Sequence, residues 1–434
     1  MDWKEQYKSF LWITGFFLFA YFMPLGNPAF NAAIYDALEL TKWYAQEHVL
    51  LCLVPAFFIA GTIAVFVSQA SVIKYFGAKA KKWLAYLVAS VSGSILAVCS
   101  CTVLPLFTSI HKRGAGLGPA ITFLYSGPAI NILAIILTAR ILGFELGIAR
   151  VIGAVVFSIV IGLIMAFIYR KEEEEKAKAQ IAMPDIPEER PMWQTATHFF
   201  ILVAILVFAT WGKPDTNEGL FYMIAKYKWL ITGLFGIALS LSLMFILKLN
   251  KIWTSLGTLL VILLAIFYGE QPLIPYTAAI IVITLLLTFA KDEPNQWLGE
   301  SWDLAKQILP LLGAGVLVAG FLLGRPGGGH GIVPQEWISA MVGGNSLFAN
   351  FFASIVAAFM YFATLTEVPI LQGLIHSGMG QGPALALLLA GPALSLPNML
   401  VIRKVIGTQK TVVYVTLVVI MATISGMTYG AFYQ

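Results

Sequence analysis

Residues 99–131 read CSCTVLPLFTSIHKRGAGLGPAITFLYSGPAIN and carry the strongest indication of the fold. Residues 363–395, ATLTEVPILQGLIHSGMGQGPALALLLAGPALS, align with this stretch without a gap at an offset of 264 residues. The aligned pairs include Thr102 and Thr366, Pro105 and Pro369, Gly114 and Gly378, Pro119 and Pro383, Gly127 and Gly391, and Pro128 and Pro392. Chance would align a few glycines but not this whole series of helix-breaking residues, so we predict two internal repeats.

The composition places these repeats in a membrane. Apolar residues make up 59% of the 434 residues and charged residues only 11%, against about 25% charged residues in a typical soluble domain. A chain with so few charges suits lipid, where the backbone must satisfy its hydrogen bonds internally. We therefore predict an all-α fold: a polytopic transmembrane helical bundle with two internal, inverted repeats that contain Pro/Gly-broken or re-entrant helices.

Apolar runs close to the ~20 residues that one span needs divide the chain into five parts. The expected parts are an N-terminal transmembrane helix and loop (1–47), repeat 1 (48–170), a charged cytoplasmic linker (171–197), connecting transmembrane helices (198–306) and repeat 2 (307–434). Two apolar stretches, 83–113 and 347–377, are interrupted by proline and small polar residues. Each is either a re-entrant hairpin or one long kinked helix, and the sequence leaves both readings open.

Basic residues near the ends of the spans set the expected orientation, because cytoplasmic loops carry an excess of lysine and arginine. Lys4 and Lys8 place the N-terminus in the cytoplasm. A re-entrant hairpin over 83–113 keeps both of its basic flanks inside and makes repeat 2 enter from the opposite face. Arg140 and Arg150 would then lie outside and count against this scheme. We expect a multi-pass protein of the cell inner membrane.

Cys99, Ser100 and Cys101 form the first candidate site. Two thiols one residue apart can hold a soft metal or metalloid together, since thiolates prefer soft partners. They can also form a redox pair, or simply pack as small apolar side chains. Repeat 2 has no cysteine at the matching positions, so a thiol site would be asymmetric.

Glu367 is the second candidate. It follows Thr366 and precedes Pro369 in an apolar stretch, and a carboxyl group there is unfavourable unless it has a function or a partner. Burial disfavours the charged form of a carboxyl group, so Glu367 is suited to carry a proton. A structural hydrogen-bonding role is the alternative.

Gly-Pro pairs break the apolar segments near polar residues that could contact a solute. Glycine turns precede the same segments, and they are either simple helix starts or anion-binding helix N-termini. The predicted substrate pathway comprises Cys99, Ser100, Cys101, Thr102, Pro105, Gly127, Pro128, Asn131, Thr366, Glu367, Pro369, Gly391, Pro392 and Asn398, with Glu367 as the proton-coupling residue.

The sequence lacks the motifs that are typical of several kinds of enzyme and metal site. The chain has no Gly-x-x-x-x-Gly-Lys-Ser/Thr phosphate loop and no zinc-type His or Cys pairing. We therefore expect no enzyme activity, no metal site and no cofactor. No basic patch interleaved with aromatic residues points to nucleic acid. The expected partners are a small-molecule or metalloid substrate and the lipid bilayer, and a homo-oligomer is left open.

The Cys-Ser-Cys segment, its Pro105 and the Ser126-Gly127-Pro128-Ala129-Ile130-Asn131 segment together resemble the predicted permeases of the YraQ and ArsP type. The ArsP branch of that family implies efflux of trivalent organoarsenicals across the inner membrane. The resemblance thus favours a secondary transporter that exports such compounds or another soft, thiol-reactive solute. The alternatives are a carrier of another small solute, such as a sulfur compound or an inorganic anion, and a membrane-embedded thiol oxidoreductase.

Overall fold

The computed structural model describes residues 3–66, 81–96, 100–181, 191–212, 219–324, 331–332, 341–359, 367–376 and 378–433. These residues form helices and no strand, apart from one isolated antiparallel bridge between Gly343 and Met379. The all-α prediction is therefore confirmed. The elements, in chain order, are α1 (Trp3–Tyr21), α2 (Pro28–Tyr44), the π-helical segment η1 (Ala45–Leu53), α3 (Val54–Phe66), α5 (Lys82–Leu96), α6 (Ser100–Lys112), α7 (Leu117–Ala129), α8 (Ile132–Ile141), α9 (Phe144–Ile168), α10 (Arg170–Ile181), α11 (Met192–Ala209), α12 (Leu220–Phe245), α13 (Lys251–Phe267), α14 (Leu273–Thr288), α15 (Glu293–Leu323), α17 (Leu347–Phe359), α18 (Glu367–His376), α19 (Gln381–Leu394), α20 (Leu396–Ile406) and α21 (Thr408–Phe432).

Five of these helical segments are long and apolar enough to cross a membrane. They are Pro28–Phe66, Phe144–Ile168, Tyr222–Phe245, Glu293–Leu322 and Thr408–Phe432. The helices α19 and α20 make a sixth candidate if they are counted as one span with a bend of 48°. The apolar helices α11, α13, α14 and α17 are shorter than the usual span.

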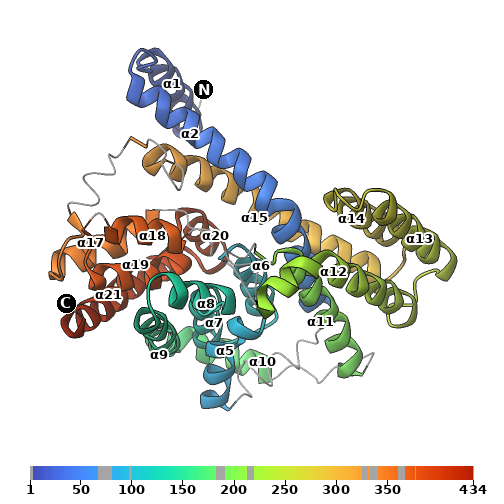
Figure 1. Cartoon of the computed structure of the whole chain (residues 1–434). Coiled ribbons are helices and arrows are strands. Elements are labelled where there is room, and N and C mark those ends of the chain that lie inside the picture. The colour runs from blue at the N-terminus through green and yellow to red at the C-terminus, as the bar shows by residue number, and fades with distance from the viewer. Residues whose placement is uncertain are drawn as a thin grey trace.

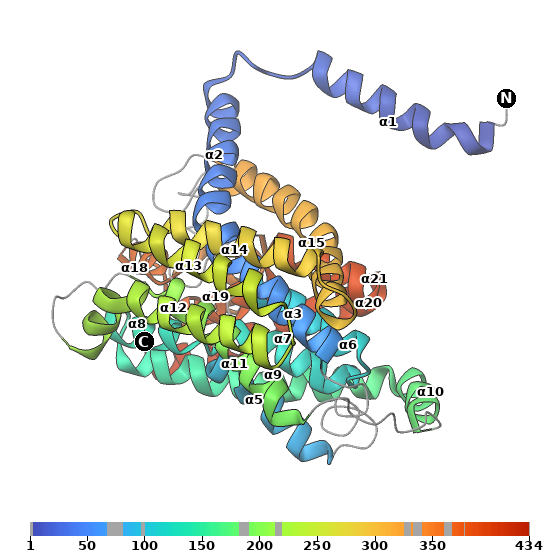
Figure 2. The ribbon, with the colours of Figure 1, turned by 90° about the vertical axis from the view of Figure 1, so that its right-hand side faces the viewer.

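The start of the chain differs from the predicted helix and loop over 1–47. The segment 28–44 is not a loop, because α2, η1 and α3 run on as one 39-residue helical segment. Its start is fixed locally: Pro28 occupies the first turn, and the Asn27 side chain accepts a hydrogen bond from the Ala29 amide at 2.9 Å. The preceding helix α1 lies apart from the rest of the molecule (Figure 2).

The stretch 83–113 is a hairpin of two helices. Tyr86 of α5 lies against Gly118 near the start of α7, and Ser126, further along α7, donates a hydrogen bond to the Ala89 carbonyl at 3.0 Å. The helices α5 and α7 therefore run in the same direction. Because α6 ends at Lys112, just before α7 begins, the chain enters and leaves this stretch at the same end of α7.

The stretch 347–377 returns on itself as well. Gly343, before α17, forms the antiparallel bridge with Met379, after α18, and the Gly380 amide donates to the Val342 carbonyl at 3.1 Å. The described helices of the two hairpins have 10 to 15 residues each, a length of about 15–23 Å at 1.5 Å per residue. These helices are shorter than the ~30 Å hydrocarbon core, which agrees with the re-entrant reading.

The helices are arranged around two buried helices, α7 and α19, which contact each other. Every residue of α19 from Gly382 to Leu394 is buried, and nearly all of α7 is too. A helix that is apolar on all sides belongs in an interior. Helices α12, α13 and α14 lie on the opposite side of the molecule from α17 to α21 (Figure 1).

Two ends of the bundle can be distinguished in Figure 2. The helices α8 and α18, which contact each other, lie at one end, called here the α18 end. The helices α6 and α20, also in contact, lie toward the other end together with α10, called here the α10 end. Both hairpins are followed by a broken helix and a long helix, but whether this order reflects an internal repeat stays a prediction.

Close packing of α7 on α9 depends on two glycines. A Cβ atom at Gly162 would lie 2.7 Å from the Gly118 carbonyl oxygen and would overlap the Thr122 hydroxyl. A backbone oxygen cannot move aside as the end of a flexible side chain can, so the two helices would have to separate.

We predict that Gly162→Ala destabilises the folded protein by about 1–3 kcal/mol, because the added methyl group overpacks this crossing. The measurement is the melting temperature of the purified protein in detergent. The matched control is Gly233→Ala on α12, where a Cβ atom would meet nothing within 4 Å. Equal melting temperatures for the two variants would contradict the packing described here.

Candidate substrate pathway

A buried ion pair lies between α9 and α18. The Arg150 side chain in α9 is completely buried, and Glu367, the first residue of α18, is only 1% exposed. Arg150 Nη2 contacts Glu367 Oε1 directly. These two residues belong to parts of the chain more than two hundred residues apart, so the pair joins the first half of the protein to the second.

Arg150 also holds the broken helix of the first half. Its Nε donates to the Ala129 carbonyl at 2.9 Å, and its Nη1 donates to Thr138 Oγ1 at 2.9 Å. Ala129 is the last residue of α7 and Thr138 lies in α8. The last carbonyl groups of a helix have no partner within that helix. The guanidinium therefore donates a hydrogen bond to a carbonyl group at the break between α7 and α8, and its positive charge is neutralised by Glu367.

The predicted pathway residues near this break are buried. Gly127 and Pro128 lie inside α7, and Asn131 lies between α7 and α8 with 4% of its surface exposed. Arg150 thus brings Glu367 of α18 to the helix break that the sequence predicts.

The corresponding break in the second half is buried as well. Gly391 and Pro392 lie inside α19, and Ser395 and Asn398 are each 1% exposed. Ser395 Oγ and Asn398 Oδ1 have no hydrogen-bond partner among the described residues. A buried polar group without a partner is unfavourable, so these two atoms are available to a polar solute.

The hairpin residues are placed only in part. Thr102 and Pro105 are buried in α6, which contacts α20, the helix of Asn398. Cys99 and Thr366 lie outside the described residues. For three further predicted residues only the backbone is described: Ser100 and Cys101 in α6 and Pro369 in α18. The thiol site therefore stays a prediction.

Sequence reasoning missed the central role of Arg150. Under the predicted orientation it counted as an outer-loop charge, and that assignment is wrong because Arg150 lies inside α9 and is buried. The signal that could have found it is the same one that identified Glu367: a charge within an apolar run has a partner or a function.

Two tyrosines were also missed. Tyr125 in α7 and Tyr414 in α21 are completely buried, and their hydroxyl groups have no hydrogen-bond partner within the described ranges. In the sequence, a single tyrosine in an apolar helix cannot be distinguished from a packing residue, so no pattern indicated that these two hydroxyl groups are buried.

The charged segment after α9 is more than a solvated linker. Its residues 170–181 form α10, and Glu173 Oε2 accepts a hydrogen bond from the Leu117 amide, at the start of α7, at 2.8 Å. Lys410 of α21 donates to Glu172 at 2.5 Å, and this hydrogen bond lowers the pKa of Glu172. The anion at the glycine turn before α7 is therefore a carboxylate of the chain itself.

A multi-pass bundle of discontinuous helices with opposite charges buried between them is the architecture of a membrane transporter. The chain belongs to the ArsP_1 family of predicted permeases, whose family model matches residues 34–431.

Two curated relatives are similar to this chain. "UPF0718 protein MJ0584" of Methanocaldococcus jannaschii is 44% identical over 387 residues, which cover 89% of this chain and 93% of the relative. "UPF0718 protein YraQ" of Escherichia coli is 30% identical over 113 residues, which cover 25% of this chain and 29% of the relative. No solved structure gives a significant match. The resemblance to permeases of this type is therefore confirmed.

We predict that removing either charge of the buried pair alone destabilises the protein by about 3–5 kcal/mol, since it leaves the other charge buried without a partner. The variants are Glu367→Gln and Arg150→Gln, and the measurement is the melting temperature in detergent. The double variant should recover much of the loss because no unpaired charge remains.

The control for this cycle is Arg170→Gln. Arg170 pairs with Glu174 on α10 at 3.6 Å, with side chains 65% and 63% exposed, and exposed pairs contribute little to stability. Losses that simply add in the double variant would mean that Arg150 and Glu367 do not interact.

Proposed function

We propose that this permease is a secondary transporter in which the Arg150–Glu367 pair couples solute movement to a proton. The main support for this role is the burial of these two opposite charges between α9 and α18. Protonation of Glu367 removes the attraction that holds α18 to α9. Deprotonation restores it, so the two protonation states favour different arrangements of the halves.

The size of this effect is adequate for coupling. Breaking a buried ion pair is unfavourable by about 3–5 kcal/mol, and about 1.4 kcal/mol changes an equilibrium tenfold. Even the lower value corresponds to a shift of roughly 150-fold between two conformations. A proton on Glu367 is therefore sufficient to bias an alternating-access equilibrium.

For the substrate we propose a soft, thiol-reactive solute such as a trivalent organoarsenical, exported across the cell inner membrane, with the N-terminus in the cytoplasm. The support is the Cys99-Ser100-Cys101 sequence, whose last two residues begin α6, together with the affinity of thiolates for soft partners. A carrier of sulfur compounds or inorganic anions would leave these thiols without a role. A thiol oxidoreductase would instead require them to cycle between reduced and oxidised forms.

The coupling role predicts that Glu367→Gln abolishes accumulation driven by a proton gradient. The measurement is uptake of methylarsenite, arsenite and thiosulfate into everted membrane vesicles, with and without the gradient. Exchange of labelled for unlabelled solute, which needs no gradient, should persist and would show that the variant is folded. Glu174→Gln, an exposed change on α10, is the control and should accumulate solute like the unchanged protein. Full gradient-driven accumulation by Glu367→Gln would exclude the coupling role.

The thiol role predicts that the Cys99→Ser/Cys101→Ser double variant loses methylarsenite uptake. Thiol labelling of reduced and oxidised membranes distinguishes a carrier from an oxidoreductase, because only the latter changes its labelling with turnover. Unchanged methylarsenite uptake in the double variant would leave the permease assignment intact and remove the soft-solute substrate.

A further inference from the structure

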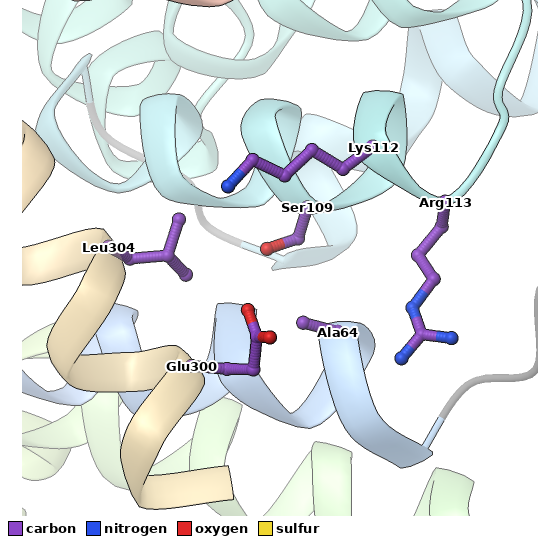
Figure 3. Close-up of a pocket in the computed structure, with 6 residues that line it drawn as sticks. All are labelled: Ala64, Ser109, Lys112, Arg113, Glu300 and Leu304. Carbon is purple, nitrogen blue, oxygen red and sulfur yellow. The ribbon is translucent and has the colours of Figure 1, made fainter. Parts of the chain in front are cut away.

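A second site lies away from the Arg150–Glu367 pair, where α3, α6 and α15 meet. It is a pocket of about 170 Å³, and its lining residues are Ala64, Ser109, Lys112, Arg113, Glu300 and Leu304 (Figure 3). The wall formed by α15 is held in place, because Trp297 Nε1 donates to the Phe58 carbonyl of α3 at 2.8 Å. The pocket is therefore bounded by fixed helices.

Ser109 gives the first indication of a ligand. It is 1% exposed, and its hydroxyl has no hydrogen-bond partner among the described residues. Its neighbour Thr108 behaves in the usual way and donates to the Leu104 carbonyl of the same helix at 2.8 Å. The Ser109 oxygen points instead into the space between Leu304 and Ala64 (Figure 3). An unpartnered buried hydroxyl is unfavourable, so a polar group that enters this pocket would satisfy it.

The charges around the pocket define the chemistry of that group. Lys112 and Arg113 lie at or just after the end of α6, and Glu300 projects from α15 toward Ser109, between Leu304 and Ala64 (Figure 3). The guanidinium of arginine matches the paired oxygens of an oxyanion, and lysine adds a second positive charge. The carboxylate of Glu300 is an acceptor, and it repels an anion that has no proton to donate.

We propose that this pocket binds a small oxyanion that retains a proton, of the hydrogenphosphate type. Its oxygens accept hydrogen bonds from Arg113, Lys112 and the Ser109 hydroxyl, and its own O–H donates to Glu300. The size is sufficient, since one water molecule needs about 10–15 Å³ of such space and the pocket offers about 170 Å³, which admits a group of several non-hydrogen atoms.

The pocket should distinguish phosphate from sulfate, two tetrahedral anions of similar size. At neutral pH phosphate keeps a proton and sulfate does not, so sulfate offers Glu300 a negative oxygen where phosphate offers a donor. The pocket should therefore prefer phosphate. The same chemistry is present in a free phosphate and in the phosphomonoester headgroup of phosphatidic acid, and the experiment has to distinguish these two sources.

The test is isothermal titration calorimetry of the full chain in phosphatidylcholine nanodiscs, with inorganic phosphate and sulfate as probes. We expect phosphate to bind at least about tenfold more tightly than sulfate, the order of effect of one good charge-assisted hydrogen bond. Arg113→Gln and the milder Ser109→Ala should both weaken phosphate binding. Glu300→Gln should bring sulfate up to the affinity of phosphate, which is a change that misfolding would not produce.

The matched control is Arg170→Gln on α10. Arg170 pairs with Glu174, is 65% exposed and does not line the pocket, so phosphate affinity should stay the same. Nanodiscs that contain phosphatidic acid identify the source: loss of the phosphate signal assigns the pocket to a lipid headgroup, and an unchanged signal assigns it to a free solute.

Absence of phosphate binding, or an Arg113→Gln variant that binds phosphate normally, would overturn the proposal. So would equal affinities for phosphate and sulfate in the unchanged protein. Because the readout is binding and not transport, failure here leaves the coupling role of Glu367 untouched, and failure of that role leaves this site untouched.

Discussion

An arginine buried within an apolar helix is tolerable only if its charge is neutralised and its donors are satisfied. Arg150, which lies in α9, meets this requirement with groups from three other helices: the Ala129 carbonyl of α7, the Thr138 hydroxyl of α8 and the Glu367 carboxylate of α18. The break between α7 and α8 and the start of α18 are thereby fixed relative to each other. Neither half of the protein can bury its own part of this arrangement alone.

The general fold is readable from the sequence because it follows from composition and from helix-breaking residues. Low charge content predicts the membrane bundle, and the Gly-Pro pairs at Gly127 and Gly391 lie close to the ends of α7 and α19, where both broken helices are interrupted. The buried Glu367 is readable for the same reason, since a carboxyl group in an apolar run needs an explanation.

The partner of Glu367 cannot be predicted from the sequence, because pairing depends on how distant helices pack and no local pattern contains that information. Arg150 looks like a loop charge when loops are assigned by counting basic residues. The path of the chain over 83–113 is similarly undetermined in the sequence, since a hairpin and a kinked helix place the same residues in the same order. Contacts of Tyr86 and Ala89 with α7 decide it in favour of the hairpin.

The two halves are joined by a second charged contact, and it differs from the first in strength. Glu172 of α10 binds Lys410 of α21 with side chains 46% and 14% exposed, and a contact so open to water contributes at most about 1 kcal/mol. The Arg150–Glu367 pair, completely buried, is unfavourable to break by about 3–5 kcal/mol. A change in the charge of Glu172 therefore has little influence on how the halves are held. A change in the charge of Glu367 has a large one, so the buried pair is the contact through which a proton can control this fold.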